Sequence, residues 1–245
     1  MKTNSFENPI VVSPEKWLAA RRELLRQEKD FTKVRDQLTL RRREMPWIKV
    51  DKAYLFTSPQ GPVTLSDLFE GRSQLIVYHF MLGPGWDEGC KSCSFVSDHL
   101  APAVVHLNAR DTAFAAISHA PLGEITPFKQ RMGWAFNWVS AHGTDFNQDY
   151  HVSFTPEELA QGEVYYNFGL QQFPVEEAPG LSVFAKDVAG TVYHSYSTYG
   201  RGLEQLIGTY TLLDLVPKGR DEAGLEYSME WVRHHDRYDP VNANA

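Results

Sequence analysis

Hydrophobic and polar positions change their spacing several times along this chain, and each spacing predicts an element. After Ser13-Pro14 the apolar residues recur at close to helical period among many charges, at Trp17, Leu18, Leu24, Leu25, Phe31, Val34 and Leu38. Ser13 suits the N-cap, Pro14 suits the first helical position, and Pro46 stops the helix. Residues 1–46 are therefore predicted as an N-terminal amphipathic helical extension. The sequence leaves two alternatives for what the apolar face of this helix packs against: its own domain, or a second subunit of a homodimer.

Strand-like runs then predict a sheet within residues 47–217. Short strands are expected at 47–50 and 54–56, and a helical turn at 64–69. Residues 75–80 and 113–118 are near-continuously apolar, as in strands covered on both faces, and 138–140 is a brief third run. Residues 181–185 and 191–196 flank a glycine turn and indicate an antiparallel hairpin.

Helical patterns separate these runs. One helix follows residue 90 and carries apolar positions to Leu107, with a kink expected at Pro102. A second is expected from Thr126 to Trp134 and a third over residues 203–215. The polar-aromatic region around 142–174 is long for a loop, so it is interpreted as an insertion with short elements.

This order predicts an α/β chain with a thioredoxin-like fold, a central mixed sheet flanked by helices. Residues 218–245 are interpreted as a C-terminal extension that packs on the domain. The 245 residues are 42% hydrophobic and 13% aromatic, which is enough for a sizeable core and excludes global disorder.

Charge and hydropathy limit the partners and the cellular compartment that we expect for this protein. The net charge of -7 argues against nucleic acid as a partner. No apolar run approaches about 18 residues, and the N-terminus has no signal-peptide core. A cytoplasmic protein with no membrane partner is therefore expected. In a reducing compartment its two cysteines favour catalysis or metal binding over a permanent disulfide.

Both cysteines lie in Gly89-Cys90-Lys91-Ser92-Cys93, after a buried strand and a glycine-rich loop and at an expected helix start. Thiols at i and i+3 share one face of a helix and can form a disulfide. Unpaired backbone N–H groups and the helix dipole favour a thiolate at the first position. Cys90 is therefore predicted to attack and Cys93 to resolve. Lys91 adds positive potential, which Asp87 and Glu88 oppose.

Three more residues are candidates for substrate binding. Pro179 directly precedes a core strand, where a cis-proline could face the dithiol and leave the backbone of Ala178 free to pair with an incoming peptide. An ordinary trans turn proline is the competing interpretation. Trp86 either shapes the rim of the thiol site or fills a loop.

Other chemistry has less support in the sequence. A zinc site at the two cysteines would need two further ligands, and the histidines are scattered. His79 lies on a buried strand and is interpreted as a core histidine. A Gly-rich phosphate loop, HExxH and GxSxG are all missing, so neither a metal nor a cofactor is predicted.

At this point the residues resemble the thioredoxin superfamily, and more specifically the bacterial family catalogued as domain of unknown function 899, described as predicted dithiol-disulfide oxidoreductases. The resemblance covers most of the chain, including RRREMPW, SDLFEGRSQLIVYHFM, GWDEGCKSCSF, RMGW, DFNQDYHVSF, GLSVFAKDVAGTVYHSYSTYGRG and WVRHHDRY. It implies a nucleophile at Cys90, a resolving thiol at Cys93 and a cis-proline at Pro179. The motif departs from the Trp-Cys-Gly-Pro-Cys of thioredoxins, which leaves the direction of the redox reaction open.

The leading hypothesis is a thiol-disulfide oxidoreductase acting on a disulfide-containing protein or a small-molecule thiol substrate. A peroxiredoxin-like peroxide reductase is the second, although Asp87 stands where such enzymes carry a threonine three residues before the cysteine. The third is a non-catalytic thioredoxin-like binding module that holds a partner or zinc.

Overall fold

The structure, a computed structural model, describes residues 9–239, and the chain divides after Pro46 into two units. The first unit contains α1 (Pro14–Arg43), which confirms the long N-terminal helix. The Ser13 hydroxyl accepts a hydrogen bond from the backbone N–H of Lys16 at 3.4 Å, as an N-cap does. None of the α1 residues is buried, so ion pairs one turn apart, such as Arg26 with Glu23 at 2.6 Å, support the helix locally.

The second unit is built on an eight-stranded sheet in the order β1-β10-β9-β4-β5-β6-β2-β3. Strands β4, β5 and β6 are parallel, and β9 and β10 are antiparallel to their neighbours. The strands are β1 (Ile48–Lys49), β2 (Leu55–Ser58), β3 (Gly61–Thr64), β4 (Gln74–His79), β5 (Thr112–Ser118), β6 (Asn137–Ser140), β9 (Gly180–Lys186) and β10 (Val192–Tyr199).

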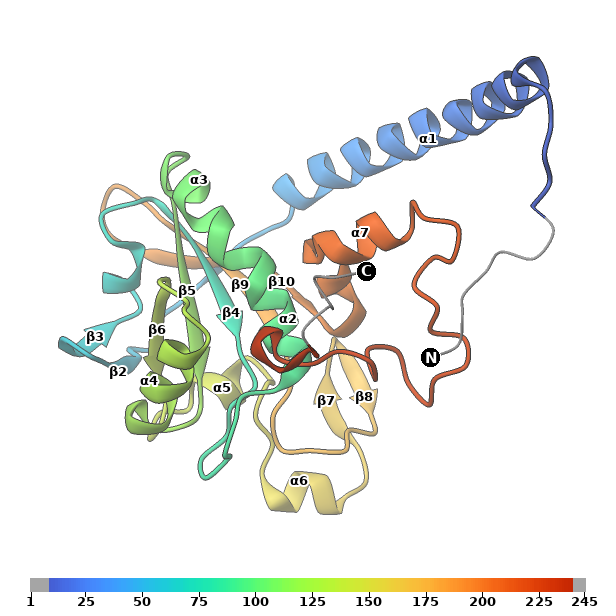
Figure 1. Cartoon of the computed structure of the whole chain (residues 1–245). Coiled ribbons are helices and arrows are strands. Elements are labelled where there is room, and N and C mark those ends of the chain that lie inside the picture. The colour runs from blue at the N-terminus through green and yellow to red at the C-terminus, as the bar shows by residue number, and fades with distance from the viewer. Residues whose placement is uncertain (1–8, 240–245) are drawn as a thin grey trace. The chain divides into compact units, whose positions relative to one another are not determined.

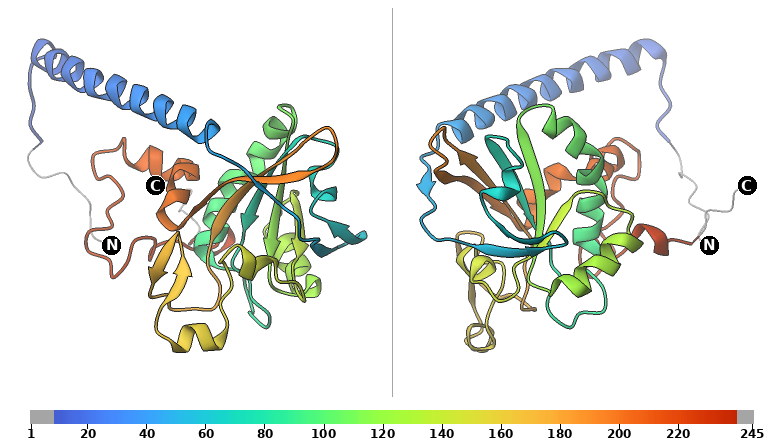
Figure 2. Two further views of the ribbon diagram at one scale, coloured as in Figure 1. Left: turned by 180° about the vertical axis from the view of Figure 1, so that it is seen from behind. Right: turned by 90° about the vertical axis from the view of Figure 1, so that its left-hand side faces the viewer.

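Helices connect the parallel strands, because parallel neighbours need a crossover. The helices are α2 (Lys91–Leu100), α3 (Val104–Asn108), α4 (Leu122–Arg131) and, after the hairpin, α7 (Gly208–Leu213). Figure 1 shows α2 and α3 crossing the sheet, and Figure 2 shows the long β9–β10 hairpin from behind. The four strands β5-β4-β9-β10, with α2 as the next helix after the central β4, form a thioredoxin-like fold, as predicted.

A separate apolar core covers each face of the sheet. Tyr78, Phe80 and Leu82 join the residues of α2, α4 and α7 on one face. Leu75 and Val77 point to the other face, where they meet the insertion. The insertion contains α5 (Phe146–Asp149), α6 (Pro156–Ala160), β7 (Val164–Tyr166) and β8 (Gly169–Gln171), so it has short elements as predicted.

The structure corrects three details of the predicted elements. α4 begins at Leu122, and Thr126 does not cap it; the Thr126 hydroxyl donates to the Leu122 carbonyl instead. The expected helix over 203–215 is a 3₁₀ helix, Gly200–Leu206, and then α7, because Ile207 takes an extended conformation between them. β3 was missed: it carries Pro62, which a strand tolerates at the sheet edge. The irregularity expected at Pro102 is present, but it is a break rather than a kink: α2 ends at Leu100 and a 3₁₀ turn, Ala101–Ala103, separates it from α3.

Candidate active site at the start of α2

Cys90 lies at the N-cap of α2, where the chain returns from the loop that leaves β4. The N–H of Cys90 donates to the Met81 carbonyl at 3.0 Å, which ties the end of the loop to its beginning. The N–H and the hydroxyl of Ser94 both donate to the Cys90 carbonyl at 2.9 Å. The backbone of Cys90 is therefore held on both sides while its side chain stays partly accessible.

Gly89 explains how the loop fits against the sheet. A Cβ atom at this position would lie 2.6 Å from ring carbons of Phe80 and of Phe128. His234, from the C-terminal extension, lies with its Nε2 atom 2.8 Å from the Gly89 carbonyl oxygen. Only a glycine brings the chain close enough to these rings to place the next residue, Cys90, at the helix start.

The two thiols have opposite electrostatic environments. The Cys93 side chain donates a hydrogen bond to the Cys90 sulfur, and this is the main reason why the pKa of Cys90 is lowered to about 6. The backbone N–H groups of Cys93 and Ser92 and the charge of Lys91 lower it further, against the effect of burial. Burial raises the pKa of Cys93, which is 1% exposed, well above its usual range.

Tyr78 is a site residue that the sequence reading did not single out. Its side chain is fully buried, and its hydroxyl lies near the Cys93 sulfur with no hydrogen-bond partner at ordinary distance among the described residues. A hydrogen bond from this hydroxyl would favour a Cys93 thiolate, while burial keeps the pKa of Tyr78 itself well above 10. The available signal was strand alternation, which places Tyr78 on the same face as Phe80.

Charged neighbours add to the asymmetry of the site. The Lys91 ammonium group donates to the Glu230 carbonyl at 3.1 Å, which keeps this charge beside the thiols. Glu88, expected to oppose a thiolate, forms an ion pair with Arg131. The positive potential of Lys91 therefore acts with less opposition than the sequence suggested.

Pro179 lines a cavity of about 230 Å³ together with Cys90 and Cys93. Every peptide bond within residues 9–239 is trans, so the cis-proline implied at Pro179 by the resemblance is wrong and the competing interpretation, an ordinary trans proline, applies. Ala178 is buried, and its N–H donates to the Val152 carbonyl at 2.9 Å. The expectation that the Ala178 backbone is free to pair is therefore wrong for its N–H group, because the insertion already occupies it.

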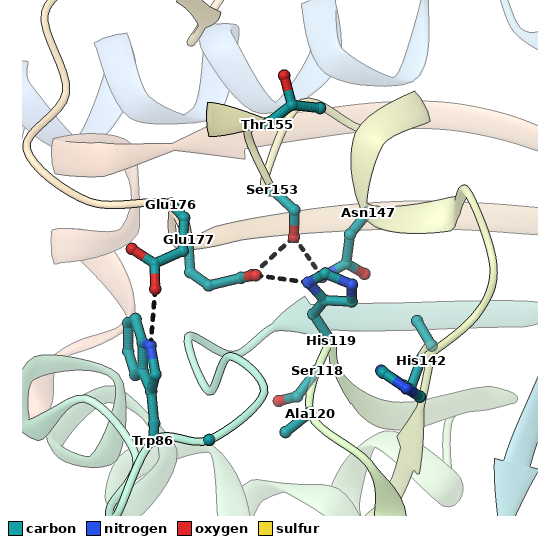
Figure 3. Close-up of polar contacts among 12 residues, drawn as sticks. Trp86, Ser118, His119, Ala120, His142, Asn147, Ser153, Thr155, Glu176 and Glu177 are labelled. Carbon is teal, nitrogen blue, oxygen red and sulfur yellow. Dashed lines mark hydrogen bonds and ion pairs between the residues drawn. The ribbon is translucent and has the colours of Figure 1, made fainter. Parts of the chain in front are cut away.

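Trp86 is not among the residues that line this cavity. Its Nε1–H donates to the Glu176 carboxylate at 2.9 Å, as Figure 3 shows. Nearby, the buried Glu177 carboxylate pairs with Nδ1 of His119 at 2.8 Å and accepts from the Ser153 hydroxyl at 2.7 Å. The pairing with Glu177 raises the pKa of His119. These contacts hold the segment that leads into Pro179 against the end of β5 and against the insertion.

The remaining candidates lie outside the dithiol site. His79 is buried with its Nε2 2.8 Å from the Ser182 hydroxyl, and burial lowers its pKa to about 3. Its Nδ1 has no partner in the part of the chain that the structure describes. Over the same residues 9–239, no group of three or more His, Cys, Asp or Glu side chains could hold a metal ion. No helix in that range is long and apolar enough to cross a membrane.

Fold and site together define a thioredoxin-like protein with two cysteines at the start of the helix after the central strand. The chain belongs to a family described as "Bacterial protein of unknown function (DUF899)", whose model matches residues 6–238. The family resemblance seen in the sequence is thereby confirmed. No curated protein matches the chain.

Several solved structures are similar at low sequence identity. Peroxidoxin BcpB from Mycobacterium tuberculosis has a TM-score of 0.42 and 14% identity, over 67% of this chain and 95% of that one. A PrxQ mutant from Xylella fastidiosa has a TM-score of 0.41 and 11% identity, over 65% and 88%. A putative thiol:disulfide interchange protein DsbE from Chlorobium tepidum has a TM-score of 0.41 and 14% identity, over 67% and 97%. The activity of this chain is therefore inferred from its own residues.

Proposed function

We propose that this protein is a thiol-disulfide oxidoreductase in which Cys90 attacks and Cys93 resolves. The observation that carries the proposal is the placement of the two thiols at the start of α2, with Cys90 partly accessible and Cys93 buried. The partly accessible Cys90 has a pKa lowered to about 6, while the buried Cys93 is held protonated and donates to it. A nucleophile that is ionised near pH 7, beside a thiol that stays neutral until the first step is over, is what a dithiol reaction requires.

The reaction transfers two electrons from the dithiol to the substrate. The Cys90 thiolate attacks one sulfur of a substrate disulfide, forms a mixed disulfide and releases the other half as a thiolate, which takes a proton. The hydrogen bond from Cys93 then has no thiolate to stabilise, so Cys93 is free to lose its proton. The Cys93 thiolate attacks the Cys90 sulfur, with a hydrogen bond from Tyr78 supporting it, and releases the second half of the substrate. A further dithiol reductant returns the Cys90–Cys93 disulfide to the thiols.

The decisive experiment measures the redox couple and traps the intermediate. The full chain is equilibrated in glutathione buffers, and the Cys90–Cys93 disulfide is quantified by mass after alkylation of free thiols. A reversible two-electron couple is expected. The variant Cys93→Ser should retain a mixed disulfide with glutathione on Cys90, and Cys90→Ser should retain none. If no Cys90–Cys93 disulfide forms at any ratio of oxidised to reduced glutathione, or if Cys90→Ser reacts as the native chain does, the proposal is wrong.

A further inference from the structure

We propose that the substrate is a low-molecular-weight disulfide with an apolar group, seated in the cavity beside Cys90, and that peptide disulfides are poor substrates. This inference rests on the proposed thiol-disulfide activity and specifies its substrate. Two features of the site carry it: the shape and lining of the cavity, and the backbone groups around Pro179 that are already hydrogen-bonded.

The lining of the cavity is mainly apolar. Its inner lining comes from β4, α2, the 3₁₀ helix and the C-terminal extension, with the side chains of Tyr78, Met81, Val96, Leu203, Ile207 and Met229. Arg201 and Glu204 also line it and pair with each other at 2.9 Å. An apolar substituent therefore gains by leaving water, while no charged group in the lining is left without a partner to attract a strongly ionic ligand.

The volume limits what fits. An apolar cavity of about 150 Å³ holds a benzene molecule, so the roughly 230 Å³ beside Cys90 and Cys93 takes a short alkyl chain or one aromatic ring with a small substituent. Ser228 and Met229 of the C-terminal extension form part of the wall. A folded protein would have to insert a protruding disulfide into a volume of this size.

Part of the backbone that an incoming peptide would pair with near Pro179 is already hydrogen-bonded. Residues 152–154 already run beside 176–178 as an added strand would. Ala178 N–H donates to the Val152 carbonyl at 2.9 Å, and Phe154 N–H donates to the Glu176 carbonyl at 2.8 Å. The Pro179 carbonyl accepts from the Tyr166 hydroxyl at 2.6 Å. Peptide recognition by strand addition requires free N–H and C=O groups at an edge, and the insertion already occupies the Ala178 N–H and the Pro179 carbonyl.

The test compares matched disulfides in single-turnover oxidation of the reduced full chain. Dipropyl disulfide and bis(2-hydroxyethyl) disulfide are nearly equal in size and differ in an apolar methyl against a hydroxyl at each end; insulin supplies protein disulfides. Each rate is divided by the rate of a free monothiol with the same reagent, which removes intrinsic reactivity. The normalised rate for dipropyl disulfide should exceed both others by about tenfold or more. The seated end of dipropyl disulfide buries a methyl group, whereas the corresponding hydroxyl would lose its hydrogen bonds to water, and the protein disulfides of insulin cannot enter the cavity as a free chain.

Two variants locate the preference. Met229→Trp places a large ring in the cavity wall and should lower the ratio of dipropyl to hydroxyethyl rates toward one. Leu212→Trp makes a similar change at an exposed apolar position of α7, outside the cavity lining, and should keep the native ratio. Thermal melting of both variants verifies that they fold.

The outcomes separate this inference from the function on which it rests. If both small disulfides have equal normalised rates, or if insulin oxidises the dithiol as fast as dipropyl disulfide, the substrate inference is overturned while the oxidoreductase stands. If no disulfide oxidises the pair and Cys90 ionises with an ordinary pKa near 8.5, the proposed function fails and the inference with it.

Discussion

The hydrogen bond from the Cys93 thiol to the Cys90 sulfur leads to a quantitative prediction for the pKa of Cys90. The drop of its pKa from 9.0 to about 6 corresponds to about 4 kcal/mol of preference for the thiolate. The Cys93 side chain is the largest cause, and a hydrogen bond to a charged acceptor contributes about 1.5–3 kcal/mol. Cys93→Ala should therefore raise the pKa of Cys90 by about one to two pH units. Cys93→Ser keeps a donor at the same place and should leave the pKa within about half a unit of its native value.

The assay is the pH dependence of Cys90 alkylation by iodoacetamide, with thiolate absorbance as a second readout. The midpoint of the profile is diagnostic, whereas the rate at pH 7 is not. A thiol of higher pKa has fewer thiolates at pH 7 but each is more nucleophilic, with a Brønsted coefficient of about 0.4–0.5, so the two effects largely offset each other. Equal midpoints in Cys93→Ala and Cys93→Ser would refute the assignment of the shift to this hydrogen bond. A native midpoint near 8.5 would refute the perturbation itself.

Three further predictions concern the surroundings of the dithiol. Gly89→Ala should lower the free energy of unfolding in urea by about 1–3 kcal/mol, because its Cβ meets ring carbons at 2.6 Å, whereas Gly123→Ala, which meets nothing within 4 Å, should cost nothing. Glu177→Gln should lower the free energy of unfolding by about 1.5–3 kcal/mol at pH 6 and by less at pH 9. Because the pKa of His119 is raised in the folded protein, its pairing with Glu177 stabilises the fold below the unfolded pKa near 6.5, and this contribution is lost as pH rises through the folded pKa. An equal cost at both pH values would contradict this. Because the pKa of His79 is lowered in the folded protein, only the unfolded chain binds this proton between pH 6.5 and about 3. The free energy of unfolding should therefore fall with falling pH in this range by up to about 1.4 kcal/mol per pH unit. In His79→Gln, the free energy of unfolding measured in urea should depend less steeply on pH.

Local patterns were sufficient for much of the architecture. The capped helix after Ser13, the apolar run of β4, the thiols at the start of α2 and the β9–β10 hairpin all follow from spacing, caps and turns within a few residues. The helix boundaries were predicted less well: α4 begins before Thr126, and the extended conformation of Ile207 divides the last helix.

The amino-acid sequence by itself determined the kind of chemistry, two thiols one helical turn apart after a buried strand, and the α/β order that presents them. Only the tertiary structure decided what surrounds them. It placed Tyr78 beside Cys93, brought Pro179 into the lining of the same cavity as the two cysteines, and paired the N–H of Ala178 with the Val152 carbonyl. The physical reason is that spacing and caps act within a turn or two, whereas burial and the pairing of backbone groups depend on segments brought together by folding.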